Sequence, residues 1–145
     1  MSARSFVDTN VLLYAYDRAA KTKQDIAKKV LQNLWWQRTG ALSMQVLQEF
    51  YVNVTRKIAS PLPKDQARKI VEKYSVWCVE MSPNEIAVAF SVEDQAKISF
   101  WDALIVASAL KAGATQILSE DLNQGQMIAG IQIENPFTMP GALAP

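Results

Sequence analysis

Short apolar runs alternate with longer stretches of helical periodicity along this chain, and this alternation restricts the possible folds more than any other feature of the sequence. Short runs of β-like composition are predicted to form strands at 5–7, 41–43, 75–81, 116–119 and 131–134. Because one or two helical stretches separate most of them, successive strands need crossover connections and pair in parallel. The sequence therefore predicts an α/β fold, a three-layer sandwich in which helices cover both faces of a five-stranded, mostly parallel sheet.

Helices are predicted between these runs from apolar spacing and from capping residues. Gly40 is interpreted as the C-cap of the second helix, and Ser82 and Ser99 as N-caps of the last two. The predicted helices are 11–16, 23–37, 44–57, 63–74, 83–97 and 100–112, with a loop at 125–130.

The length of 145 residues fits one compact domain, and half of the residues are apolar, which is enough for a hydrophobic core. We predict a single domain at 1–138, followed at 139–145 by a flexible tail rich in proline, glycine and alanine. The chain shows neither a signal-peptide pattern nor an apolar run near the about 20 residues of a membrane span. These features indicate a soluble protein of the cytoplasm.

Histidine is absent and cysteine occurs once, as Cys78. This composition excludes the histidine pair of metal-free ribonucleases, the Ser-His-Asp triad, and zinc sites built from histidine or cysteine. A single cysteine also forms no internal disulfide, which suits a reducing cytosol. The net charge of +1 argues against a chain that coats nucleic acid by bulk charge. A hydrolase of this composition would depend on carboxylates and a hard cation.

Four acidic residues are predicted to lie at one edge of the sheet, the edge where ligands of open parallel sheets bind. Asp8 and Asp121 follow the first and fourth predicted strands directly, and Asp102 lies in the first helical turn after Ser99. Glu49 lies about 9 Å into its helix, but its side chain tilts back toward the helix start. Mg²⁺ prefers a few carboxylates together with waters that phosphate oxygens can replace. This set therefore points to phosphodiester hydrolysis assisted by a metal ion.

Each acid also has a purely structural interpretation. Asp8 could cap the helix that follows it, as could a neighbouring polar residue, and Ser99 with Asp102 matches a capping box. Glu49 could be a solvated helix residue, and Asp121 part of a polar turn. The weight of the functional interpretation comes from the joint placement of the acids, and from the apolar surroundings of Asp8 and Asp102, where an unpaired carboxylate is costly.

The residues around these acids resemble those of a known family. The matching blocks are Phe6-Val7-Asp8-Thr9-Asn10-Val11-Leu12, Gln48-Glu49-Phe50-Tyr51, Phe100-Trp101-Asp102-Ala103-Leu104-Ile105 and Ile117-Leu118-Ser119-Glu120-Asp121-Leu122. In this order and at these spacings the chain resembles the PIN-domain nucleases, and within them the VapC toxins of toxin–antitoxin pairs. The resemblance covers nearly the whole chain.

The resemblance implies a divalent-metal site that takes Mg²⁺ or Mn²⁺, with structured RNA as the substrate. The catalytic residues and metal ligands that it implies are Asp8, Glu49, Asp102 and Asp121. Asn10 and Ser119 match positions that support the site by hydrogen bonds, and Thr9 and Glu120 stand beside them as further supporting residues. Family members commonly form homodimers and are silenced by a cognate antitoxin protein, so both partners are expected here.

The chain departs from the family at one position. Some members carry a further acid a few residues after the one at Asp121, where this chain has Gln124, Gly125 and Gln126. A second metal position therefore lacks a ligand, for which Glu120 could partly compensate.

Arg18 and Lys21 follow the Asp8 block and are candidate contacts for RNA phosphates, although a solvated surface is the alternative. Two other functions stay open at this point. A catalytically silent RNA-binding module would have the same fold. A phosphatase of the haloacid-dehalogenase type also has an acid after its first strand, but it needs a second aspartate where this chain has Asn10.

Overall fold

The computed structural model describes residues 3–138, so the tail predicted at 139–145 lies outside the described residues. The strands are β1 (Arg4–Val7), β2 (Gly40–Ala41), β3 (Ala114–Leu118), β4 (Met127–Ile128) and β5 (Ile131–Glu134). The helices are α1 (Thr9–Tyr14), α2 (Thr22–Gln37), α3 (Met44–Arg56), α4 (Lys64–Tyr74), α5 (Pro83–Ala96) and α6 (Phe100–Lys111). No helix within residues 3–138 is long and apolar enough to cross a membrane.

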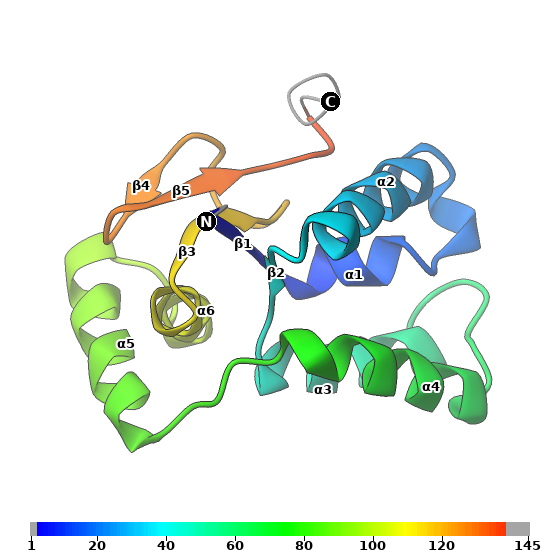
Figure 1. The fold of residues 1–145 in the computed structure, drawn as a ribbon, viewed down its shortest axis with the longest axis horizontal. Coiled ribbons are helices and arrows are strands. Elements are labelled where there is room, and N and C mark those ends of the chain that lie inside the picture. The colour runs from blue at the N-terminus through cyan, green and yellow to red at the C-terminus, as the bar shows by residue number, and fades with distance from the viewer. Residues whose placement is uncertain (1–2, 139–145) are drawn as a thin grey trace.

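The strands form one sheet in the order β2-β1-β3-β5-β4. The pairs β2–β1, β1–β3 and β3–β5 are parallel, and β4 alone runs antiparallel to its neighbour. Helix α6 packs on one face of the sheet and α2 lies behind the other, while α5 packs outside α6 and the pair α3–α4 lies beside α1 (Figure 1). The predicted three-layer α/β sandwich with a mostly parallel five-stranded sheet is confirmed.

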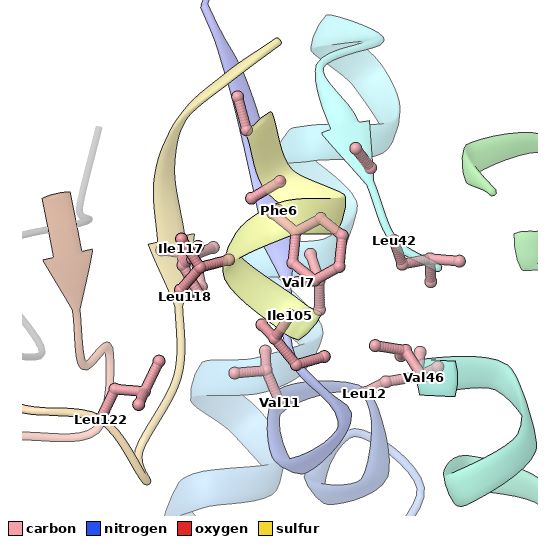
Figure 2. Close-up of a cluster of buried hydrophobic side chains, with 14 of the residues drawn as sticks. Phe6, Val7, Val11, Leu12, Leu42, Val46, Ile105, Ile117, Leu118 and Leu122 are labelled. Carbon is pink, nitrogen blue, oxygen red and sulfur yellow. The ribbon is translucent and has the colours of Figure 1, made fainter. Parts of the chain in front are cut away.

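The hydrophobic core reaches the carboxyl end of the central strands. Val7 ends β1 fully buried, and Figure 2 shows Val11 and Leu12 of α1 and Ile105 of α6 gathered just beyond it. Helix α1 is short, but its two buried aliphatic side chains fix it against this end of the core. A polar side chain immediately after β1 therefore lies next to buried apolar side chains.

The predicted helices agree with the structure to within one or two residues, but one predicted strand and one predicted loop were wrong. The segment predicted as a strand at 75–81 begins as a 3-10 turn at Ser75–Trp77 and then joins the sheet only by a single bridge between Leu42 and Cys78. Ser75 donates its hydroxyl to the Val71 carbonyl at 2.6 Å, which continues helical geometry where the β-like composition predicted a strand.

The fifth strand of the sheet comes instead from the predicted loop at 125–130. Met127–Ile128 forms β4 and pairs with β5 through a tight turn in which Ala129 and Gly130 have positive φ angles of 52° and 82°. A strand of two residues is too short to produce a periodic signal in the sequence. The number of strands was therefore predicted correctly with one member misplaced.

The prediction that Gly40 is the C-cap of α2 was wrong. Arg38 takes the left-handed cap conformation instead, at φ 59°. Gly40 instead begins β2, where the Trp77 ring covers it so closely that a Cβ atom would lie 2.5 Å from the ring. The glycine at this position therefore serves a close contact between the first residue of a strand and an aromatic ring, not a turn.

We predict that Gly40→Ala destabilises the protein by about 1–3 kcal/mol, the usual cost of overpacking. The measurement is urea unfolding followed by circular dichroism. The control is a double-mutant cycle with Trp77→Leu, whose smaller side chain leaves room for the new methyl group. Trp77→Leu should lower the free energy of unfolding less in the Gly40→Ala background than in the wild type. An equal loss in both backgrounds would contradict the proposed contact.

Candidate active site

Asp8 stands at the end of β1 and caps α1. Its Oδ1 accepts the Thr9 backbone N–H at 2.8 Å, and its Oδ2 accepts the Ser119 hydroxyl at 2.8 Å. The register places Val7 opposite Leu118, so the residues that follow β1 and β3 are neighbours. Only 8% of the Asp8 surface is exposed. Both interpretations of this residue hold together, since the carboxylate is a helix cap and is also held at the edge of the sheet.

The surroundings of Asp8 disfavour its charged form. Burial raises the pKa of Asp8 from 3.8 to about 6, although the hydrogen bonds from Ser119 and Thr9 act in the opposite direction. The nearby charges of Asp121 and Glu49 raise the pKa of Asp8 further. Three of the predicted acids therefore interact electrostatically at this edge of the sheet.

The side-chain amide of Asn10 ties the two strand ends together. Its Nδ2 donates to Asp121 Oδ2 at 3.2 Å, to Ser119 Oγ at 3.3 Å and, more weakly, to Asp8 Oδ2 at 3.5 Å. Its Oδ1 accepts the backbone N–H of Glu120 at 3.1 Å. Asn10 thus supplies donors to the acids while fixing the chain that follows β3.

Ser119 is fully buried and completes this network. Its hydroxyl oxygen accepts the backbone N–H of Asp121 at 3.1 Å while the hydroxyl donates to Asp8. Asp121 is exposed, and its position is set by its own backbone and by Asn10. The structure therefore brings Asn10, Ser119, Asp8 and Asp121 together as a connected group.

Glu49 and Asp102 approach the same edge from helices. Thr9 donates its hydroxyl to Glu49 Oε2 at 3.4 Å, which connects α3 to the start of α1. Asp102 lies half-buried in the first turn of α6, where its backbone N–H bonds to Ser99 Oγ at 3.1 Å. In the part of the chain that the structure describes, the Asp102 carboxylate takes part in no hydrogen bond or ion pair, so no such contact ties it to the other three acids. Within residues 3–138 no three acids are close enough to ligate one ion as the side chains lie.

The chemistry of this donor set nevertheless fits a hard divalent cation. All four acids offer oxygen ligands, the kind that Mg²⁺ and Mn²⁺ prefer. In the described part of the chain the ion pairs are Lys23–Glu120 and Lys111–Glu85, so no lysine or arginine neutralises any of the four. A buried carboxylate next to further uncompensated acids is the environment in which a bound cation lowers the free energy most.

Glu120 is held away from the other acids by two residues that the sequence reasoning did not assign to the site. Lys23 Nζ lies 2.6 Å from Glu120 Oε2, and Tyr14 donates its hydroxyl to Glu120 Oε1 at 2.6 Å. Burial acts to raise the pKa of Glu120, but these two contacts outweigh it and lower that pKa. With both oxygens engaged, Glu120 supports the loop after β3 and is not free to replace the missing further acid.

Tyr14 and Lys23 could not have been found from spacing. Lys23 is 97 residues from Glu120 in the chain, and Tyr14 fits the apolar face of a helix. Arg18 and Lys21, the predicted phosphate contacts, are exposed in the segment between α1 and α2 and contact none of the four acids. Their role in binding RNA stays a prediction.

A match to one protein family covers most of the chain. A family model described as PIN domain matches residues 5–127, which contain every residue of the candidate site. No curated protein matches the chain.

Several solved structures are similar in fold. A toxin–antitoxin complex from Klebsiella pneumoniae has a TM-score of 0.68 at 19% identity, covering 93% of this chain and 98% of that one. VapBC2 from Rickettsia felis, bound to a DNA fragment from its promoter, has a TM-score of 0.61 at 17% identity, covering 90% and 97%. VapC20 from Mycobacterium tuberculosis, described as a toxin that cleaves the sarcin–ricin loop, has a TM-score of 0.59 at 20% identity, covering 81% and 89%.

We predict that the metal-free protein becomes less stable as the pH rises from about 4 to above 6. The pKa of Asp8 is raised on folding from 3.8 to about 6, so the folded protein binds the proton more tightly than the unfolded chain does. The resulting gain in the free energy of unfolding is complete below pH 3.8 and is lost as the pH rises through about 6. A shift of this size corresponds to about 3 kcal/mol. Thermal unfolding in chelator across this pH range measures it.

The matched variant is Asp8→Asn, which keeps the shape of the side chain and cannot ionise. It should unfold at a higher temperature than the parent at pH 7.5 in chelator, and its stability should vary less with pH. If the parent and the variant show the same pH dependence, the raised pKa of Asp8 is wrong.

Proposed function

This chain belongs to the PIN domain family, and on that premise we propose that it is an endoribonuclease that hydrolyses phosphodiester bonds of structured RNA with Mg²⁺ or Mn²⁺. The residues that would hold the cation are Asp8, Glu49, Asp102 and Asp121. The haloacid-dehalogenase alternative is set aside, because Asn10, at the position of the required second acid, has no ionisable proton and donates to three neighbours.

The observation that carries this proposal is the state of Asp8. A carboxylate that is almost fully buried, and whose pKa is raised to about 6 beside further acids, is costly in a protein that never binds a cation there. Strained electrostatics of this kind are typical of functional sites. The same residues at the carboxyl edge of a parallel sheet are also where a substrate can reach them.

When bound, the cation would supply a Lewis acid for the scissile phosphate and lower the pKa of an attacking water. The chain's own residues prepare the place. Ser119 and the Thr9 backbone orient the Asp8 carboxylate, and Asn10 holds Asp121 beside it. Lys23 pairs with Glu120, the residue between Ser119 and Asp121, and so holds it in place while neutralising its charge.

We further propose that the protein is the toxin of a toxin–antitoxin pair, acts in the cytoplasm as a homodimer and is silenced by a cognate antitoxin. Supporting this, structures of similar fold include toxin–antitoxin complexes, and a further one is described as a toxin that cleaves the sarcin–ricin loop. The helix cap alone would require Asp8 in a silent RNA-binding module too, so what favours an active enzyme is the gathering of further acids, Asp121 and Glu49, around this buried carboxylate.

We predict that the purified protein, freed of any bound antitoxin, cleaves total RNA at discrete positions with Mg²⁺ or Mn²⁺ and is inactive in excess chelator. Asp8→Asn and Asp102→Asn should lower the cleavage rate by more than the about 10–100-fold that the loss of a supporting partner costs. Cleavage is followed on gels that resolve single nucleotides.

The matched control is Asp94→Asn, which removes an exposed acid of α5 that forms no hydrogen bond or ion pair with the four candidate ligands and should cleave like the parent. Cleavage that survives chelator or Asp8→Asn would contradict the metal-dependent mechanism. A well-folded protein that binds RNA but never cleaves it would favour the silent module.

A further inference from the structure

The candidate active site poses an electrostatic problem for a polyanionic substrate. Its four acids lie at the edge where the scissile phosphate has to bind, and no lysine or arginine in residues 3–138 forms an ion pair with any of them. A bound cation neutralises part of this charge but leaves no surplus with which to attract the rest of an RNA strand. Affinity for RNA, which depends mainly on its phosphates, has to come from another surface.

The positive charge of the chain is concentrated on two helices. Helices α2 and α4 together contain seven of the fifteen lysine and arginine residues but only three of the fourteen acids. The whole chain has a net charge of only +1, so the remainder is acidic. Helices α2 and α4 lie on the same side of the molecule as α1 (Figure 1).

Aromatic rings lie between these two basic helices. Trp35 of α2 packs against Tyr74 of α4 and against Trp77, with ring centroids 5.8 and 5.5 Å apart. Lys73 Nζ lies 5.0 Å from the Trp35 ring centroid and 5.2 Å from that of Tyr74. Neither Lys73 nor Lys28 pairs with an acid in the described structure, so both charges are available to a ligand.

Trp36 stands beside this cluster with 85% of its surface exposed. An indole left so far in water has no packing role within the described chain. Trp36 lines, with Trp35, Tyr74, Lys28 and Lys73, a shallow cavity of about 210 Å³. We call these five residues the aromatic–lysine surface.

We propose that the aromatic–lysine surface binds an unpaired stretch of the RNA substrate, with a base stacked on Trp36 and phosphates beside Lys28 and Lys73. This inference rests on the proposed ribonuclease function and names the surface that gives it affinity. Aromatic rings interleaved with cations are the usual way in which proteins bind single-stranded nucleic acid without reading its sequence. An exposed indole next to lysines matches that chemistry.

The surface lies within reach of the candidate active site. Ala15 and Tyr16, directly after α1, line the same cavity, whereas Asp8 caps the opposite end of α1. Six helical residues span about 9 Å. At about 3.4 Å per nucleotide of a stacked strand, two or three nucleotides connect the two places.

The test measures binding apart from cleavage. A labelled oligouridylate of about 12 nucleotides is titrated into the cleavage-deficient Asp8→Asn protein in chelator, by fluorescence anisotropy at several salt concentrations. Trp36→Ala, in this background, should weaken binding about tenfold, as expected for one lost stacking contact. Lys28→Gln with Lys73→Gln should reduce the magnitude of the slope of log K against log salt by about 1.4, about 0.7 for each lost phosphate contact.

Two controls match these changes in type. Phe90→Ala removes an exposed aromatic side chain of α5, and Lys97→Gln removes an exposed lysine after that helix. Both should bind the oligonucleotide like the Asp8→Asn parent. Circular dichroism of each variant confirms that the fold is kept, which is expected for Trp36→Ala because its side chain is so exposed.

Unchanged RNA affinity in Trp36→Ala and in the lysine variant would overturn the proposal and leave a protein partner as the occupant of the surface. Failure of the ribonuclease function has a different signature, because the wild-type protein would then bind the oligonucleotide through this surface and not cleave RNA. If the wild type cleaves RNA and Trp36→Ala cleaves it with the same rate and KM, the inference about this surface is wrong while the ribonuclease function stands.

Discussion

The parallel pairing of β1 with β3 is the constraint on which the site depends. Because Val7 lies opposite Leu118, the residues after both strands emerge side by side, and Asp8 meets Ser119 without any long loop. The apolar core rises to this edge through Val11 and Ile105, which is why the carboxylate is desolvated (Figure 2). The same sheet geometry therefore provides the contact between the two segments and the electrostatic cost that a cation would relieve.

The edge of the sheet is organised by small polar groups rather than by charge pairs. Ser119, Thr9 and Asn10 donate to the acids without neutralising them, whereas Glu120, which pairs with Lys23, turns toward α1 and α2. Neutral donors orient a carboxylate and leave its charge for a ligand. An arginine in their place would occupy the carboxylates itself.

The sequence predicted what depends on local rules. Helix bounds follow from periodicity and caps, and the placement of Asp8 and Asp121 follows from the ends of strands. The strand predicted at 75–81 was wrong because amino-acid composition does not reveal the hydrogen bond from the Ser75 hydroxyl to the Val71 carbonyl. Strand β4 was not predicted because Met127–Ile128 is too short to show a period. The Lys23–Glu120 pair joins residues far apart in the chain, and whether three of the acids come close enough to ligate one ion depends on side-chain conformations, so neither could be predicted.

The connected part of the site consists of two short segments, 8–10 and 119–121, at the ends of adjacent strands. Most of its hydrogen bonds run within or between these two tripeptides. In evolutionary terms this connected part is compact, since six positions carry most of its geometry, whereas Glu49 and Asp102 come from two helices and the rest of the chain has to keep a packed core beneath them. Such a chain can accumulate substitutions over most of its length, and can acquire new surfaces on its helices, while its chemistry is inherited unchanged.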